Sequence, residues 1–376
     1  MSVRSLPDHT TMTSDRSKQK MNGSAPHGYL FNGFDRRMDT LLLSPIRIRI
    51  RIRIKTLSLY AMAGAALLGG FVCTAVRAQA PKPAFELQGI SPSFWNLVDR
   101  DAQLVTVASG FGFTEGPVWD KTGFLWVSDE VINKIFRVNL ADGQKQEVIS
   151  LGDPDGNTYD KQQRLLDCAS VLRAVIRLSP DGKSYVIVAD HYQGKRLNSP
   201  NDVVLGPDGA IYFTDPTSDL PAGQKQEIPF KGVYRIGKDG QVQLLTKELT
   251  EPNGLAFSPD GKKLYVDDSE QRNIRVYDFQ PDGTLANGRI FGDEKAGPKD
   301  GVPDGLKVDM EGNLYAVGPK GIWAWSPQGI HLGTIVVPEQ PANLAWGDAD
   351  YSTLFITAGT SVYKIHTKVH GFVPYL

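Results

Sequence analysis

The chain has few of the residues that build the commonest hydrolase and metal sites. Its 376 residues include only two cysteines, Cys73 and Cys168, and six histidines, and no G-x-S-x-G sequence occurs. Two cysteines cannot build a cysteine-ligated zinc site. Cys73 lies in a segment that we expect to be removed, so Cys168 is left without a disulfide partner. The absence of a nucleophile-elbow motif argues against a serine hydrolase.

An excess of positive charge is also absent from the main part of the chain. The formal net charge is −1, but residues 1–80 hold 12 basic and 4 acidic side chains, whereas the remainder holds 29 and 38. The remainder is therefore acidic by 9 charges. Such a surface repels a phosphate backbone, so we expect no nucleic-acid partner.

The N-terminal part has the order of a targeting sequence. Residues 1–40 are polar and unpatterned, and residues 46–55 read "IRIRIRIRIK", a monotonous repeat. We interpret residues 1–55 as a disordered, low-complexity leader. Residues 56–80 form an apolar stretch behind this basic flank and end in Ala78-Gln79-Ala80. This order predicts a signal peptide and a periplasmic or secreted protein. The alternative is that the same stretch is retained as a membrane anchor, the only membrane contact that we expect.

The rest of the chain is rich in turn residues and repeats itself. The whole chain has 38 glycines and 24 prolines, which is typical of a turn-rich β protein. Six segments share a polar residue, in five of them beside Gly, Asp or Pro, then a short apolar strand, a turn and a second strand. They are "FTEGPVWDKTGFLWVSD", "DPDGNTYDKQQRLLDCA", "NSPNDVVLGPDGAIYFTD", "TEPNGLAFSPDGKKLYVDD", "GVPDGLKVDMEGNLYAVG" and "QPANLAWGDADYSTLFITA".

This repeat predicts an all-β fold, a six-bladed β-propeller over residues 95–376. A period of about 40 to 50 residues with several short strands is the signature of a propeller blade. We expect residues 103–111 to pair with residues 361–367 and close the ring. Two β-sandwich domains are the alternative, but they give no reason for a polar residue at the same place in every copy. Those residues are Glu115, Asp155, Asn201, Asn253, Asp304 and Asn343.

The geometry of a propeller predicts that these polar residues converge. The innermost strand of each blade lines the central channel, so residues just before these strands meet at one end of it. Turn capping is the alternative reading for Asn343 and Asp155, because Asn and Asp favour turns. It fits Glu115 poorly. Glu115, Asn201, Asn253 and Asp304 offer only oxygen donors, which favour one divalent cation, Ca²⁺ first, with Zn²⁺, Mg²⁺ and Mn²⁺ open.

Four motifs resemble the gluconolactonase branch of the SMP-30/gluconolactonase/LRE family. They are "FTEGPVW", "GKRLNSPNDVV", "EPNGLAFSPDGKKLYV" and "VPDGLKVDMEGNLYA", and the resemblance covers residues 95–370. It implies a metal-dependent propeller that hydrolyses small lactones, such as sugar lactones. It also implies that Glu115, Asn253 and Asp304 are metal ligands. By the same resemblance, Asn201 faces both metal and substrate, and Asp304 serves as the general base.

The second blade departs from this family pattern. Asp155 stands where relatives have Asn, and Ala169-Ser170-Val171 stands where they have Glu-His-Gly. Residues 217–220 differ as well. We expect these positions to line the substrate side rather than the metal. Two other functions stay open: a non-catalytic propeller that binds a ligand or partner around a structural metal, and hydrolysis of another ester, such as a phosphotriester.

Overall fold

The computed structural model describes residues 84–295, 297 and 301–376. The chain divides into two units, residues 1–75 and 76–376, and every described residue belongs to the second. The leader and the signal peptide or anchor predicted for residues 1–80 lie outside the described residues. Within the described part, no helix combines the length and the apolar character that crossing a membrane requires.

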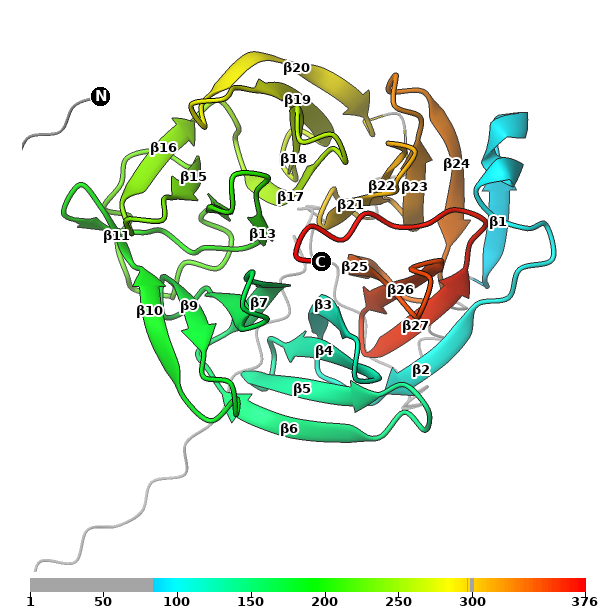
Figure 1. Cartoon of the computed structure of the whole chain (residues 1–376), viewed down its shortest axis with the longest axis horizontal. Coiled ribbons are helices and arrows are strands. Elements are labelled where there is room, and N and C mark those ends of the chain that lie inside the picture. Colours follow the sequence, from blue (N-terminus) through cyan, green and yellow to red (C-terminus); the bar gives the residue numbers. More distant parts are fainter. Residues whose placement is uncertain (1–83, 296, 298–300) are drawn as a thin grey trace, which may run out of the picture. The chain divides into compact units, whose positions relative to one another are not determined.

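Six antiparallel sheets surround a central axis as the blades of a propeller (Figure 1). Blade I contains β3 (Thr114–Asp120), β4 (Phe124–Asp129), β5 (Lys134–Asn139) and β6 (Lys145–Ser150). Blade II contains β7 (Pro154–Tyr159), β8 (Leu165–Ala169), β9 (Ala174–Leu178) and β10 (Tyr185–Ala189). The hairpin of β11 (His191–Tyr192) and β12 (Lys195–Arg196) leads to blade III. Blade III contains β13 (Val203–Leu205), β14 (Ile211–Asp215), β15 (Gly232–Ile236) and β16 (Val242–Thr246).

Blade IV follows along the chain, and blades V and VI each include a strand from the start of the described chain. Blade IV is regular, with β17 (Pro252–Phe257), β18 (Lys263–Asp268), β19 (Asn273–Phe279) and β20 (Leu285–Asp293). Blade V contains β21 (Leu306–Val308), β22 (Leu314–Gly318), β23 (Gly321–Trp325) and β24 (His331–Val336), and β1 (Glu86–Gly89) adds a fifth strand outside β24. Blade VI contains β25 (Pro341–Gly347), β26 (Thr353–Ala358) and β27 (Ser361–His366), completed by β2 (Val105–Ser109). A 3-10 helix, η1 (Pro92–Asn96), lies between β1 and β2. The six-bladed fold and its closure by β2 are confirmed.

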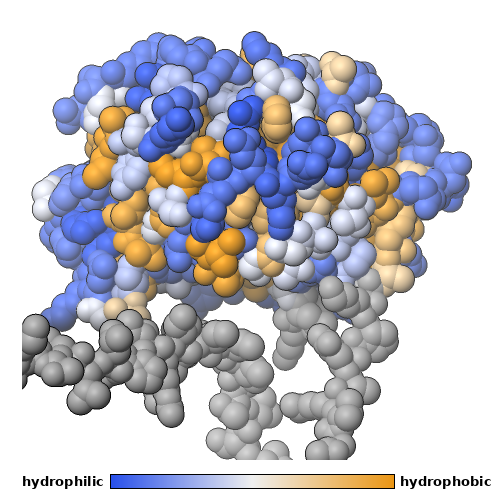
Figure 2. Space-filling view, turned by 90° about the horizontal axis from the view of Figure 1, so that it is seen from below, coloured by the Kyte–Doolittle hydropathy of each residue, from blue (hydrophilic) through white to orange (hydrophobic). Residues whose placement is uncertain are grey.

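The inner strands of a blade are apolar and buried, whereas the outermost strands are more polar and exposed. β14 reads "IYFTD" and is buried at every position, because both of its faces pack against neighbouring blades. β6 reads "KQEVIS" and is mostly exposed at the outer edge. The face of the molecule seen from the β6 edge is accordingly largely hydrophilic, with apolar patches between (Figure 2).

The hydrophobic core lies between blades rather than within them. Leu166 and Cys168 of blade II form one cluster with Phe213 and Tyr234 of blade III, and the two aromatic rings stack at 5.2 Å. Burying such a side chain stabilises the fold by roughly 1.5–3 kcal/mol. Among the described residues Cys168 is a free thiol, and it is fully buried in this cluster.

The C-terminal segment crosses one end of the central channel (Figure 1). The Phe372 N–H donates to the Val308 carbonyl at 3.0 Å, and the Tyr375 hydroxyl donates to the Trp119 carbonyl at 3.2 Å. Both acceptors lie toward the C-terminal ends of innermost strands. The segment therefore covers the end of the channel opposite to the residues that precede those strands.

Candidate active site

The innermost strands approach one another so closely that glycine follows four of the polar residues at the channel entrance. The Gly156 N–H donates to the Asn201 carbonyl at 2.8 Å, and the Gly254 N–H donates to the Asp304 carbonyl at 3.2 Å. A Cβ atom on Gly254 would lie 2.2 Å from that carbonyl oxygen, so no larger residue fits without movement. These contacts between blades hold the preceding side chains at one level of the channel.

One cavity of about 210 Å³ opens at this end of the channel. It is lined by the four residues predicted to bind a cation, Glu115, Asn201, Asn253 and Asp304, and by Asp155. Side chains that are up to 189 positions apart in the sequence thus share one site. Whether these four residues hold a cation stays a prediction, but the turn-capping reading of Asp155 does not account for its position in the cavity.

Asn343 does not belong to this ring. The Gly305 N–H donates to the carbonyl of Ala342, so Ala342 occupies the place that the polar residues have in other blades. Asn343 lies one residue deeper and is buried, and its Oδ1 accepts a hydrogen bond from the Lys307 Nζ at 3.2 Å. The sixth copy is therefore offset by one residue from the alignment that the sequence suggested.

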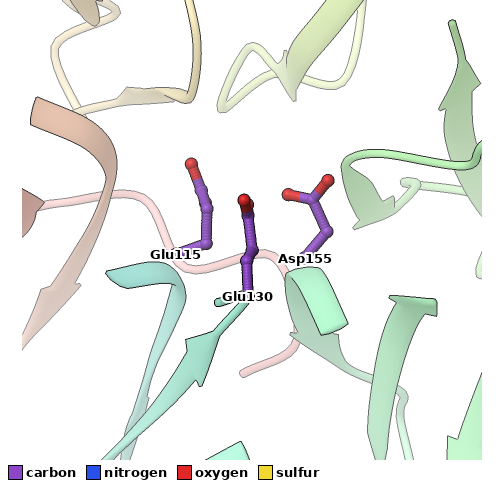
Figure 3. Close-up of side chains that lie close together, drawn as sticks. All are labelled: Glu115, Glu130 and Asp155. Atoms are coloured by element: carbon purple, nitrogen blue, oxygen red, sulfur yellow. The ribbon is translucent and has the colours of Figure 1, made fainter. Parts of the chain in front are cut away.

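Glu130 is a cavity residue that the repeat does not reveal. Glu115, Glu130 and Asp155 each place a carboxylate oxygen within 4.8 Å of the others, and the three side chains point to the same space (Figure 3). Glu130 directly follows β4. Since neighbouring strands of a blade are antiparallel, the end of the second strand lies at the same face as the start of the first. This rule could have identified Glu130, as well as Ser218, Asp219 and Ser269, which also line the cavity.

The altered residues of blade II have two different positions. Asp155 accepts a hydrogen bond of 2.7 Å from the Asn201 amide nitrogen inside the cavity. Ala169 and Ser170 are fully buried and do not line the cavity, contrary to our expectation. Ser170 lies directly behind the cavity residue Asp155, with its hydroxyl oxygen 3.4 Å from the Asp155 carboxylate. The Ser170 hydroxyl donates to the Pro200 carbonyl at 2.7 Å and so fixes the segment that precedes Asn201.

Burial and mutual repulsion raise the pKa values of four carboxyl groups in the cavity. Burial raises the pKa of Glu115 to about 7, although the Gly116 N–H, which donates to the carboxylate at 2.6 Å, lowers it. Burial, and next to it the charge of Glu115, raises the pKa values of Asp304 and Glu130 well above the usual range. Burial and the charge of Glu130 do the same for Asp155. The cavity therefore favours either protons or a cation.

The donor set fits a hard divalent cation. The polar side chains that line the cavity offer carboxylate, amide or hydroxyl oxygens, with no sulfur or imidazole among the described lining residues. Ca²⁺ and Mg²⁺ prefer such ligands. A cation would also relieve the repulsion that raises the pKa values. Glu130 and Asp155 enlarge the set of four candidate ligands to six.

Fold and cavity together define a six-bladed propeller with an acidic, oxygen-lined site at its hub. The family model described as "SMP-30/Gluconolactonase/LRE-like region" matches residues 113–360. This match spans more than half of the chain. The chain belongs to the SMP-30/gluconolactonase/LRE-like family.

Three relatives illustrate the range of the family. A gluconolactonase from Zymomonas mobilis is 34% identical over 306 residues, which cover 75% of this chain and 86% of the relative. A solved gluconolactonase from Xanthomonas campestris is 31% identical with a TM-score of 0.70, over 76% of this chain and 96% of the other. Diisopropyl-fluorophosphatase from Loligo vulgaris is 26% identical over 69% of this chain and 91% of its own.

Proposed function

We propose that this protein is a lactonase that opens sugar lactones with the help of a bound divalent cation. The observation that carries the proposal is that Glu115, Asn201, Asn253 and Asp304 line one cavity at the hub. The Zymomonas mobilis and Xanthomonas campestris relatives, both gluconolactonases, support the reaction class.

The side chains of the cavity have different roles in ester hydrolysis. Glu115, Asn201, Asn253 and Asp304 would hold the cation, and Ca²⁺ fits these oxygen donors best. When bound, a divalent cation would supply Lewis-acid chemistry, polarising the lactone carbonyl and lowering the pKa of a water molecule. Asp304 accepts the proton of the attacking water, a role that contributes roughly 10²–10⁴-fold to the rate.

Asn201 has a second role toward the substrate. With a cation bound nearby, Asp155 would be ionised and could only accept hydrogen bonds. The amide nitrogen of Asn201 would then face Asp155, and its amide oxygen would be left for the cation. The amide nitrogen carries a second N–H, which can be donated to the oxyanion that forms at the substrate carbonyl. We also propose that the protein is exported, on the basis of Ala78-Gln79-Ala80 after an apolar stretch.

The proposal is tested by following acid release. Purified protein is added to an unbuffered solution of glucono-1,5-lactone, and acidification is compared with the spontaneous rate, with and without a chelator. We expect acceleration that the chelator abolishes and that Ca²⁺ restores. Asp304→Asn should lower the rate at least 100-fold, whereas Glu311→Gln, an exposed carboxylate after β21, should not change it.

Two other outcomes would point elsewhere. A protein that accelerates no lactone in a panel of aldonolactones and simple lactones, yet loses thermal stability in Asp304→Asn, is a binding propeller with a structural cation. A protein that hydrolyses only phosphotriesters shares its reaction with the Loligo vulgaris relative, whose printed name describes a fluorophosphatase.

A further inference from the structure

The connection between the second and third strands is much longer in blade III than in the other blades. It comprises residues 216–231, between β14 and β15, whereas the corresponding connections of the five other blades, all within the described chain, have two to four residues. Connections longer than about 12–15 residues without helices or strands are uncommon, and those that occur usually have a function. Ser218 and Asp219, near the start of this loop, line the cavity at the hub.

One carboxylate joins the two ends of this loop. Glu251, which directly precedes β17 of blade IV, also lines the cavity. Its Oε1 accepts a hydrogen bond of 2.8 Å from the Thr217 N–H, and its Oε2 accepts one from the Lys231 Nζ. The side chains of Glu251 and Lys231 are only 14% and 23% exposed, so salt screens this ion pair less than one at the surface. Glu251, Thr217 and Lys231 together form a clamp that closes the loop at its base.

The middle of the loop has a separate anchor. Arg173 of blade II is buried, and its guanidinium donates a hydrogen bond of 3.0 Å to Gln224 Oε1. Ile228 is buried in the core between blades II and III. Residues 217–223, the part of the loop that lines the cavity, therefore lie between this anchor and Glu251.

We infer that Glu251 is a positioning residue: by binding Thr217 and Lys231 together, it holds residues 217–223 in place as a wall for the substrate. The inference rests on the proposed function, because the substrate is the lactone of that reaction. A wall that is already in place needs no ordering when the substrate binds. A wall that is in place about one tenth of the time would lower the apparent affinity about ten-fold. Glu251 has no part in opening the ring, so the effect lies in binding.

Lys231 offers the sharpest test, because it is not among the residues that line the cavity. Lys231→Met removes the donor of the clamp. We expect KM for glucono-1,5-lactone at saturating Ca²⁺ to rise about 5–20-fold, with kcat nearly unchanged. Lys231→Arg keeps a cationic donor and should recover most of the parent KM. Lys238→Met, which replaces an exposed lysine of the same blade, is the matched control and should change neither constant.

Glu251→Gln shows whether the two side chains act as a pair. The variant keeps an acceptor for Thr217 but loses the charge that binds Lys231, so KM should rise as in Lys231→Met. The double variant should be no worse than either single variant, because a broken pair cannot be broken twice. Calorimetric titration should give both single variants a Ca²⁺ affinity close to that of the parent. A large loss in Glu251→Gln that Lys231→Met lacks would overturn the inference and make Glu251 a cation ligand.

Hydrogen exchange keeps this inference separate from the proposed function. By mass spectrometry, the amides of residues 217–223 should exchange faster in Lys231→Met than in the parent or in Lys238→Met, whether or not lactones are hydrolysed. Gluconolactam contains an amide that resists opening, and its affinity, measured by calorimetry, should fall by the factor by which KM rises. Equal exchange in the parent and Lys231→Met, or faster exchange with an unchanged affinity for the lactam, would overturn the positioning role.

Discussion

The side-chain amide of Asn201 donates a hydrogen bond of 2.7 Å to the carboxylate of Asp155. The two residues come from blades III and II, and both are buried in the wall of the cavity. The side-chain amide of Asn can rotate by 180° at almost no cost. A hydrogen-bond partner is therefore needed to decide whether its oxygen or its nitrogen faces the cation. Asp155, which departs from the family pattern, thus orients the candidate ligand Asn201.

Replacing Asp155 should weaken cation binding through Asn201. Asp155→Ala removes the acceptor, and we expect a 10–100-fold loss of Ca²⁺ affinity, as is usual when a partner of a metal ligand is removed. Asp155→Asn keeps an acceptor oxygen and should retain more of the affinity. Calorimetric titration of both variants with Ca²⁺ makes the comparison. Equal losses in the two variants would show that the charge of Asp155 matters and its hydrogen bond does not.

The cation-free protein should become less stable as the pH rises through neutrality. The pKa of Glu115 is raised from 4.5 to about 7, first by burial, so the folded state binds a proton that the unfolded state has lost. The contribution of Glu115 is therefore lost between about pH 4.5 and pH 7, and this one group accounts for about 3 kcal/mol of the free energy of unfolding.

Thermal unfolding in chelator and in Ca²⁺, from pH 5 to pH 8, measures this effect. We expect Ca²⁺ to raise the melting temperature more at pH 8 than at pH 5, because at pH 5 protons compete for the same oxygens. In chelator, Glu115→Gln should have a flatter pH profile than the parent protein. A parent profile that is already flat in chelator would contradict the raised pKa.

The repeat predicted the fold because the strands and turns of a blade come from one continuous segment of the sequence. Each copy holds its own strands and turns, and only the order of the copies is needed to close the ring. Side-chain convergence followed from the same regularity, which is why Glu115 and Asp304 could be placed in one cavity although they are 189 residues apart.

The sequence misplaced Asn343 and missed Glu130. In the first case the repeat can be aligned in two ways that differ by one residue, and in the second the residue lies outside the repeat. Asn343 is the polar residue of the sixth copy, but it occupies the position that is glycine in four other blades, and only the contacts between blades reveal this. Glu130 lies beyond the repeated segment, at the start of a connection whose sequence differs in every blade. Its approach to Glu115 and Asp155 depends on strand direction and not on a motif.

Gly254 should not tolerate a side chain. In Gly254→Ala the new Cβ would meet the Asp304 carbonyl at 2.2 Å, and the backbone of two blades would have to separate. We expect a loss of at least about 1–3 kcal/mol in the free energy of unfolding and weaker Ca²⁺ binding, because Asn253 and Asp304 move apart. Denaturant unfolding and calorimetry measure the two effects.

Gly240→Ala is the matched control. Gly240 has open space around its Cβ position, and its φ of +77° limits the expected cost to about 1 kcal/mol of backbone strain. Cation affinity should be unchanged in this variant. If Gly254→Ala is no less stable than Gly240→Ala, the close packing of the innermost strands is not what holds the ring together.

Glu339 should stabilise the protein against acid. Burial acts to raise the pKa of this carboxylate, but the Thr360 N–H at 2.8 Å and the hydroxyls of Ser361 and Tyr363 at 2.8 and 2.9 Å together lower it to about 2. A lowered pKa means that the stabilisation is fully present above about pH 4.5 and is lost as the pH falls toward 2. After allowance for solvent screening of this partly exposed group, about 1–2 kcal/mol is at stake.

Glu339→Gln tests this at the acid end of the profile, where the Glu115 effect has the opposite sign. We expect the variant to be less stable than the parent protein at pH 6 and closer to it near pH 2, since about half of the parent carboxylates are then protonated. Glu311→Gln, whose carboxylate is exposed, should follow the parent at every pH. A difference between parent and Glu339→Gln that stays constant from pH 6 to pH 2 would mean that lost hydrogen bonds, rather than the charge, account for the change.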